Sequence, residues 1–341
     1  MNRLCRHLLL LALPLAALSS CDVHQWPQEE VPVVEPLAVN LVFSTEFTDI
    51  DYPLQPDSRA NSYKAYNIPL DHGIVSYTVR SFPQNENGEI DRTKFEELTF
   101  TRAITDGYDC SFTLDLDPGR YTLMVWAMLA ETPSGPFYYD ASNFWDIKLV
   151  GDHTANTDYR DAFRGMVDVE VGAGLGATVQ MTRPLAKFEF ITTDLDDFLD
   201  KETRRRGLTL TDDSRGELDD YIVEFYYVGY MPSSYSLPQD RIVDSTTGVK
   251  FRSTLTQLSA NEASMGFDYV FVNPEETHVT LQVALYDATS GDRLSMSEGI
   301  RIPVMRSYDT IVWGQFLFKK AAGGIGVDPG YNGDFNIFTP M

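Results

Sequence analysis

The chain has 341 residues, of which 27 are basic and 50 acidic, and its formal net charge is −23 at pH 7. A surface this acidic repels phosphate backbones and anionic lipid headgroups, so we expect no nucleic acid partner and no basic membrane-binding patch. Beyond the N-terminal segment, no apolar stretch approaches the length of a membrane-spanning helix.

The N-terminal segment has the layout of a secretory signal peptide. Arg3 and Arg6 give it a basic start, and an apolar run from Leu8 to Leu18 follows. The run is too short for a spanning helix, and it ends in Leu-Ser-Ser-Cys, which resembles a bacterial lipobox. We therefore predict a lipoprotein signal peptide over residues 1–20 and lipidation of Cys21. The alternative is an ordinary secretory signal in which the cysteine falls by chance.

Acylation of Cys21 would determine where the protein resides. Two or three acyl chains on one N-terminus hold a soluble domain on a membrane, since each buried methylene contributes about 0.8 kcal/mol. We expect an outer membrane lipoprotein exposed at the cell surface, with the membrane as a partner through the N-terminal lipid.

Cysteine usage agrees with an exported, acylated chain. Cys5 lies in the leader and Cys21 would be acylated, so Cys110 is the one thiol left in the mature chain and no internal disulfide can form. Cys110 begins a strand-like run and has no histidine near it in sequence. We interpret it as a buried, small apolar residue and not as a nucleophile.

Residues 21–36 are predicted to form a lipid-anchored tether. Their prolines stiffen the segment and remove backbone donors, so it should not pair deeply into a sheet. The remaining chain is too long for one ordinary domain and suits two of about 150 residues each. We predict an N-terminal domain over residues 37–182 and a C-terminal domain over residues 183–341.

The first of these domains shows the period-2 pattern of half-buried strands. Apolar residues alternate with polar ones from Val39 to Phe43 and from Val75 to Val79. A turn at Asp117–Gly119 precedes another alternating run that ends at Leu129. These runs predict strands with one face toward a core.

A glycine-rich segment, Gly172–Gly176, separates the strand-like runs Val167–Val171 and Ala177–Met181. A phosphate-cradling loop would be followed by a helix, whereas a second strand follows here. We interpret the segment as a hairpin turn between the two strands.

A second series of strand-like runs follows residue 183. Alternation is regular over Val279–Leu285, and Ile311–Phe318 is more continuously apolar. One helix is predicted over Asp196–Arg206, because acidic residues occupy its first turn, arginines its last, and Gly207 follows. We interpret the arginines as a solvated helix end, with an anion site as the alternative.

The order of these elements indicates the fold class. Strands recur with turns between them and do not alternate with helices, which favours sandwiches over a parallel sheet. We therefore predict an all-β protein of two tandem antiparallel β-sandwich domains with one or two short helices. The break between the domains is expected near Met181–Pro184.

No catalytic or metal-binding motif stands out. The histidines of the mature chain are far apart in sequence and form no i, i+4 pair, so we expect no metal and no cofactor; they are His24, His72, His153 and His278. The best calcium-like loop, residues 328–334, departs from the EF-hand pattern and is interpreted as a turn. We expect no enzyme activity, and a hydrolase using paired carboxylates is the alternative.

Aromatic residues cluster in two places, over residues 138–145 and 226–235. Stacking on sugars is one use of such clusters, and packing in a core or an interface is the commoner use. A platform of Tyr138, Tyr139 and Trp145 on one open face would indicate glycan binding.

Six short motifs follow one another along the chain: the lipobox with Cys21–Pro27, Leu116–Tyr121 with Trp126, Tyr159–Phe163, Arg183–Phe188, Gly266–Asn273 and Gly333–Ile337. In their order and spacing they resemble the FimB/Mfa-type fimbrial anchor lipoproteins and related fimbrillin-like surface lipoproteins. The resemblance spans nearly the whole mature chain, although each motif alone is weak.

The resemblance implies two transthyretin-like sandwiches and a lipid-anchored subunit at the base of a fimbria. Assembly in that family resembles strand exchange, in which the terminal strand of one subunit fills a groove of its neighbour by β-augmentation. A fimbrial shaft subunit is the implied partner, and no groove residue is implied. The alternative is a surface lipoprotein that binds glycan or protein without a fimbrial role.

Overall fold

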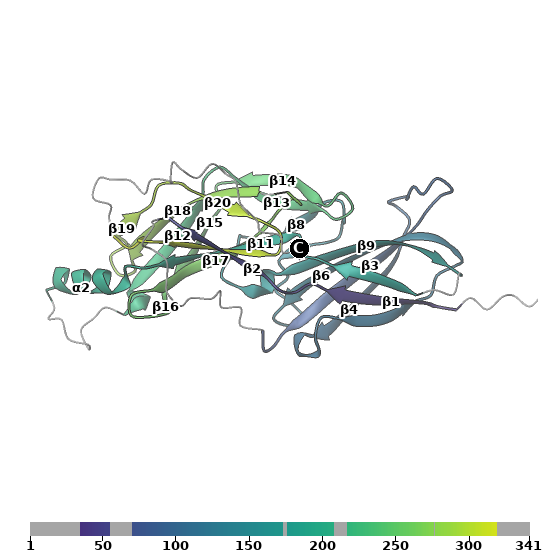
Figure 1. Cartoon of the computed structure of the whole chain (residues 1–341), viewed down its shortest axis with the longest axis horizontal. Helices are drawn as coiled ribbons and strands as arrows, with labels where there is room; N and C mark the ends of the chain where they lie inside the picture. The colour runs from purple at the N-terminus through teal and green to yellow at the C-terminus, as the bar shows by residue number, and fades with distance from the viewer. Residues whose placement is uncertain (1–34, 55–69, 173–175, 208–216, 276, 319–341) are drawn as a thin grey trace, which may run out of the picture. The chain divides into compact units, whose positions relative to one another are not determined.

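The computed structural model describes residues 35–54, 70–172, 176–207, 217–275 and 277–318 (Figure 1). The predicted signal peptide, Cys21, the tether up to residue 34 and the calcium-like loop lie outside the described residues. The described residues from Pro36 onward belong to one compact unit. In the described part of that unit, no helix combines the length and the apolar character needed to cross a membrane.

The described residues fold into five β-sheets, which confirms the predicted all-β class. Two of the sheets form a first sandwich: sheet I has the strand order β10-β1-β5, and sheet II has the order β4-β3-β6-β9. Their strands are β1 (Leu37–Phe43), β3 (Ile74–Pro83), β4 (Glu96–Ala103), β5 (Cys110–Leu114), β6 (Gly119–Ala130), β9 (Ala162–Val171) and β10 (Ala177–Met181).

Aromatic contacts join the facing sides of sheets I and II. The ring of Phe43 in β1 lies 6.1 Å from that of Tyr77 in β3 and 5.1 Å from that of Phe163 in β9. Phe112 of β5 contacts Phe100 of β4, with ring centroids 5.3 Å apart. Buried and exposed residues alternate along β1, so the period-2 prediction for this strand is confirmed.

Sheets III and IV form a second sandwich. Sheet III has the order β16-β17-β11-β21-β2, and sheet IV has the order β15-β12-β18-β19, with β20 also paired to β18. Their strands are β2 (Thr48–Pro53), β11 (Leu185–Thr192), β12 (Tyr221–Tyr227), β15 (Lys250–Thr254), β16 (Thr256–Gln257), β17 (Ala263–Phe271), β18 (Thr277–Asp287), β19 (Arg293–Met296), β20 (Ile300–Val304) and β21 (Tyr308–Gly314).

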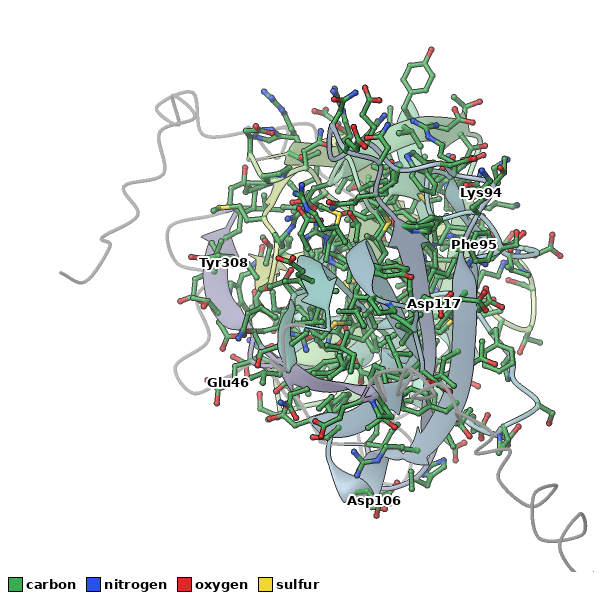
Figure 2. The ribbon with its side chains drawn as sticks, turned by 90° about the vertical axis from the view of Figure 1, so that its right-hand side faces the viewer. Glu46, Lys94, Phe95, Asp106, Asp117 and Tyr308 are labelled. Atoms are coloured by element: carbon green, nitrogen blue, oxygen red, sulfur yellow. The ribbon has the colours of Figure 1, made fainter. Side chains whose placement is uncertain are left out.

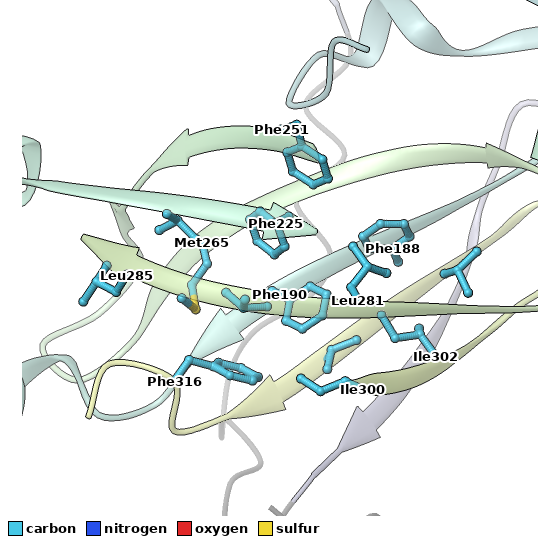
Figure 3. Close-up of a cluster of buried hydrophobic side chains, with 14 of the residues drawn as sticks. Phe188, Phe190, Phe225, Phe251, Met265, Leu281, Leu285, Ile300, Ile302 and Phe316 are labelled. Atoms are coloured by element: carbon cyan, nitrogen blue, oxygen red, sulfur yellow. The ribbon is translucent and has the colours of Figure 1, made fainter. Parts of the chain in front are cut away.

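The core of this second sandwich is rich in phenylalanine (Figure 3). Phe190 of β11 packs against Phe225 of β12 at 5.2 Å between ring centroids, and Phe225 stacks on Phe251 of β15 at 4.6 Å. Leu281 and Leu285 of β18 are fully buried in the same core. The regular alternation over Val279–Leu285 therefore marks the core face, as predicted.

Sheet V has the order β14-β13-β8-β7 and combines strands from both halves of the chain. Its strands are β7 (Tyr139–Asp140), β8 (Ile147–Leu149), β13 (Tyr230–Ser236) and β14 (Arg241–Thr247). Beneath it, Phe82 and Trp126 of the first sandwich share a core with Tyr235 of β13 and Phe271 of β17. Two strands that precede residue 182 pair with strands that follow it, β8 with β13 and β2 with β21. The division of the chain near residue 182 stays a prediction.

Three strand pairs are parallel within these otherwise antiparallel sheets. They are β1 with β10, β11 with β21, and β2 with β21. All three join segments far apart in sequence, and such pairings cannot be read from local periodicity.

The hairpin predicted around Gly172–Gly176 is wrong. β9 pairs with β6 in sheet II, whereas β10 pairs with β1 in sheet I, so the chain crosses between the sheets of the sandwich here. Gly165 of β9 permits a close approach to β10, because a Cβ at this position would lie 2.5 Å from Val179 Cγ1 and from Met181 Sδ. A period-2 pattern identifies the buried face of a strand, but it does not determine which other strand pairs with it.

The predicted helix is confirmed as α2 (Leu195–Arg205). Asp196 and Asp197 lie in its first turn, and Gly207 follows with φ of +71°. Two of the arginines at its end are paired with carboxylates: Arg205 Nε lies 2.6 Å from Glu202 Oε2, and Arg206 Nη1 lies 2.8 Å from Asp220 Oδ2.

Candidate functional site

Three of the sequence motifs, which lie far apart in the chain, meet in one buried charged cluster. The short 3-10 turn Asp158–Arg160 and the start of β9 supply one part, the segment leading into β11 supplies the second, and the middle of β17 supplies the third. The charged members of the cluster are His153, Asp158, Arg160, Asp161, Arg183, Lys187, Asp268 and Asp309.

Asp268 of β17 is the most highly connected residue of the cluster and is fully buried. Arg160 Nη1 lies 2.5 Å from its Oδ1, and both His153 Nε2 and the Tyr227 hydroxyl lie 2.6 Å from its Oδ2. Burial raises the pKa of the Asp268 carboxyl, but the charges of Arg160 and His153 outweigh burial and hold that pKa below its usual value. The carboxylate therefore stays ionised inside the protein.

Lys187 of β11 bridges two other carboxylates. Its Nζ lies 3.3 Å from Asp158 Oδ1 and 3.7 Å from Asp309 Oδ2, and the Tyr269 hydroxyl donates to Asp158 at 2.6 Å. Asp309 of β21 is fully buried, and its carboxylate accepts no hydrogen bond from the described residues. Burial raises the pKa of Asp309 to about 7, and Lys187 opposes that rise only in part.

Arg183 ties the segment between β1 and β2 to the start of β9. Its Nε lies 2.9 Å from both carboxylate oxygens of Asp161, and its other nitrogens donate to the backbone carbonyls of Thr45 and Glu46. The guanidinium also lies 3.8 Å from the centroid of the Phe47 ring. Burial raises the pKa of Asp161, and the charge of Arg183 opposes that rise.

A cleft of about 460 Å³ opens beside Arg183. Its walls include Phe47, Tyr108, Asp158 and Tyr269. The charged groups of the buried cluster already face partners of opposite charge, so the arrangement fastens chain segments together.

The other residues singled out from the sequence lie apart from this cluster. Cys110 is buried at the start of β5, and burial raises the pKa of its thiol, which fits a packing role. His72 contacts Asp71 at 2.5 Å near the first sandwich, whereas His153 belongs to the charged cluster. Among the described residues, no three His, Cys, Asp or Glu side chains gather as a metal site would require.

The aromatic platform anticipated at residues 138–145 is not formed as expected. Tyr139 is buried and donates its hydroxyl proton to the backbone carbonyl of Arg160 at 2.5 Å, and Phe144 is fully buried. Tyr138 and Trp145 are only partly buried. Tyr139 is not available for stacking on a ligand, because its ring packs in the core beneath sheet V.

One feature of the sequence could have indicated the charged cluster, namely charged residues inside an otherwise apolar strand. Lys187 and Glu189 interrupt the apolar strand Leu185–Thr192, in which every residue is buried. A charge within a strand that is buried on both faces requires a charged partner. The partner Asp309 comes more than a hundred residues later and could not be identified from spacing.

The chain was compared with curated proteins and with solved structures. No curated protein matches it. Three similar solved structures are a proposed polysaccharide-binding protein of Bacteroides thetaiotaomicron (16% identity, TM-score 0.40, 76% of this chain and 79% of that one), a proposed cell adhesion protein of Bacteroides eggerthii (12%, 0.43, 85% and 89%) and the fimbrial anchor protein Mfa2 of Porphyromonas gingivalis (12%, 0.37, 77% and 82%).

One protein family covers almost the whole chain. The sequence model of a family of unknown function, DUF6562, matches residues 31–339. The match begins within the predicted tether and runs through both sandwiches and sheet V. The chain therefore belongs to family DUF6562.

Proposed function

We propose that the protein is a lipid-anchored, cell-surface subunit that holds the base of a fimbria and binds its neighbour by β-strand addition. The observation that carries the proposal is the position of β1. This strand begins at Leu37, directly after the predicted tether, and it occupies the middle of sheet I. Fully extended, residues 22–36 would separate Cys21 from β1 by about 50 Å.

A central strand suits a chain that is held by its N-terminus. β1 pairs with β10 from Val39 to Phe43 and with β5 from Leu37 to Leu41. A pull on the lipid acts along β1, so it would shear both ladders of backbone hydrogen bonds at once. Leu37, Val39 and Leu41 are also buried, which adds apolar contacts that the strand would have to break.

The same segment continues into the second sandwich. After β1, the carbonyls of Thr45 and Glu46 accept hydrogen bonds from Arg183, and β2 then pairs with β21 along its whole length. Residues 37–53 thus bind to both sandwiches. A load applied at Cys21 would be spread over two cores, as an anchor requires.

The edge strand β14 offers a place for strand addition. β14 pairs with β13 on one side and forms the outer edge of sheet V (Figure 1). Nearly all of its residues are exposed, including the apolar Val243 at 43%. An added strand would pair with the outward backbone groups of β14, and side-chain pockets would supply specificity. Two backbone N–H groups of β14 would first have to leave side-chain partners, since those of Ile242 and Ser245 donate to Asn273 Oδ1 and Asp244 Oδ1.

Crosslinking in cells followed by pull-down tests this proposal. The wild-type protein should recover a fimbrial shaft subunit, and Cys21→Ala should release the protein from the membrane and from that complex. The matched control is Cys110→Ala, which removes the other thiol of the mature chain and should leave recovery unchanged. Recovery of the membrane-bound lipoprotein without a shaft subunit would overturn the fimbrial role. It would favour the alternative of a glycan- or protein-binding surface lipoprotein.

A further inference from the structure

Two ordered loops meet above the buried ring of Phe82 at the end of β3. The first loop joins β3 to β4, and the side chains of Asn85 and Asp91 accept backbone hydrogen bonds within it at 2.9–3.0 Å. The second joins β7 to β8, where Asn143 Oδ1 accepts a hydrogen bond from the backbone N–H of Trp145 at 3.0 Å. Local hydrogen bonds thus hold both loops in a defined shape.

Each loop presents one aromatic ring to solvent. Phe95 is 40% exposed and lies 5.3 Å from the ring of Phe82, which is itself buried. The partly exposed ring of Trp145 lies 5.4 Å from Phe82 in an edge-on arrangement. The buried ring therefore positions two exposed rings that come from loops far apart in sequence. Figure 2 shows Phe95 beside Lys94 near the edge of the view.

Two arginines contact these aromatic rings; one is buried and paired with a carboxylate, and the other is exposed. Arg80 is buried between Phe95 and Phe144, at 4.8 and 4.4 Å from their centroids, and its Nε is paired with Glu97 at 2.6 Å. Arg92 is exposed, and its guanidinium lies 4.7 Å from the centroid of Trp145. Within the described residues Arg92 makes this ring contact and donates no hydrogen bond, so its five N–H groups are free for a ligand.

We propose that Phe95, Trp145 and Arg92 form a carbohydrate-binding surface. The apolar face of a pyranose ring would stack on the exposed aromatic rings, and Arg92 would donate to adjacent hydroxyls or to a sugar carboxylate. None of these three residues belongs to β14, so the proposal does not rest on strand addition. It replaces the platform that includes Tyr139, since Phe95 supplies the second exposed ring.

The chemistry of the surface favours a sugar over other occupants. Two rings expose too little apolar area for a stable protein interface, which needs about 800 Å² from each partner. The exposed charged residues Lys94 and Glu96 flank Phe95 in the sequence, and such polar surroundings suit a hydroxylated ligand better than a lipid tail. The ordered loops reduce the entropy lost on binding.

A glycan microarray of neutral and acidic oligosaccharides, probed with the full-length protein in detergent, tests the proposal. The wild type should be retained on a defined set of spots. Phe95→Ala and Trp145→Ala should each weaken binding about tenfold, the size expected for one lost stacking contact. Arg92→Ala should weaken binding to the same spots, and Arg92→Lys should be intermediate because a lysine keeps the charge without the planar set of donors.

Tyr230→Ala is the matched control, because Tyr230 is an aromatic residue that is 75% exposed at the start of β13, outside the two loops. It should bind every spot like the wild type, and the Tyr230 and Arg92 variants should retain the wild-type melting temperature within about 2 °C, as surface substitutions do. The melting temperatures of the two ring variants, whose rings also pack on Phe82, show that each is folded at the temperature of the assay. The proposal is overturned if no spot retains the wild type, or if the ring variants bind as well as the wild type. Crosslinking of a protein to position 95 in cells, without glycan binding, would assign the surface to a protein partner and overturn it as well.

Discussion

Arg160 and Asp268 form a fully buried ion pair, with Nη1 and Oδ1 2.5 Å apart, that joins the turn before β9 to the middle of β17. Removal of one partner leaves a buried charge without compensation, which costs about 3–5 kcal/mol. We expect Arg160→Ala to lower the free energy of unfolding by this amount, as measured by urea denaturation.

The control for this loss is an arginine with a similar pair distance whose own side chain is exposed. Arg252 Nε lies 2.6 Å from Glu224 Oε2, but the arginine side chain is 66% exposed. Glu224 itself is buried, but it keeps Lys250 and the Tyr226 hydroxyl as partners, so Arg252→Ala should cost less than Arg160→Ala, about 1 kcal/mol. Equal losses for the two variants would show that the Arg160 pair contributes no more than a surface contact.

Asp309 makes the stability of the protein depend on pH. Its folded pKa of about 7 lies above the ordinary value of 3.8, so the folded state binds a proton that the unfolded state has released between these values. The contribution of Asp309 to stability is therefore complete below about pH 4 and is lost as the pH rises to about 7. Asp309→Asn should remove this dependence, which amounts to at most about 4 kcal/mol because one pKa unit corresponds to 1.36 kcal/mol.

Urea denaturation of the wild type and of Asp309→Asn at pH 5 and pH 7.5 tests that sign. The wild type should lose more stability than the variant between the two pH values. Lys187 keeps Asp158 as a partner in the variant, so the substitution should not strand its charge. A variant that loses as much stability as the wild type would assign the pH dependence to other groups.

Arg183 is expected to secure the link between β1 and β2. A lysine can keep the charge opposite Asp161, but it cannot at the same time donate to the carbonyls of Thr45 and Glu46. Arg183→Lys should therefore speed amide hydrogen exchange at Ser44 and Thr48, whose N–H groups bond to Met181 and Ser307.

Exchange at strands distant from this link is the internal control for Arg183→Lys. The amides of β18 should keep their wild-type protection, because the core of the second sandwich is unchanged. If protection falls evenly over the whole chain, Arg183 acts on global stability and does not secure the link in particular.

Gly165 is expected to tolerate no side chain. A Cβ at this position would lie 2.5 Å from both Val179 and Met181 of β10, so sheets I and II would have to move apart. Gly165→Ala should cost about 1–3 kcal/mol in urea denaturation, the usual range for overpacking. Gly299→Ala is the milder control, since its Cβ would meet only Thr280 Cγ2 at 3.3 Å. A loss no greater than that of the control would mean that the two strands separate easily.

The sequence was sufficient for the elements whose signal is local. Alternation predicted the strands around Val75–Val79 and Val279–Leu285, and the charge order predicted α2. Prediction from alternation failed where the result depends on which strands pair, as at Gly172–Gly176. Two alternating runs on either side of a glycine-rich segment have the same pattern whether they join one sheet or two. The parallel pairing of β2 with β21 could not be predicted for the same reason, because it depends on which strands become partners.

Only part of the charged cluster could be predicted from the sequence. Arg160, Arg183 and Asp268 fell inside the motifs that carry the family resemblance, but their pairing is a three-dimensional property. Trp145 was singled out as an exposed ring, whereas Phe95 was not, because its position depends on the ring of Phe82 beneath it.

Site-specific photo-crosslinking on the cell surface tests the central proposal most directly. A photoreactive residue at Val243 of β14 would be compared with one at Met296 of β19, which has a similar exposure of 36%. The proposal predicts that position 243 crosslinks a single fimbrial shaft subunit and that position 296 does not. No crosslink at position 243, or the same partners at both positions, would contradict strand addition at β14.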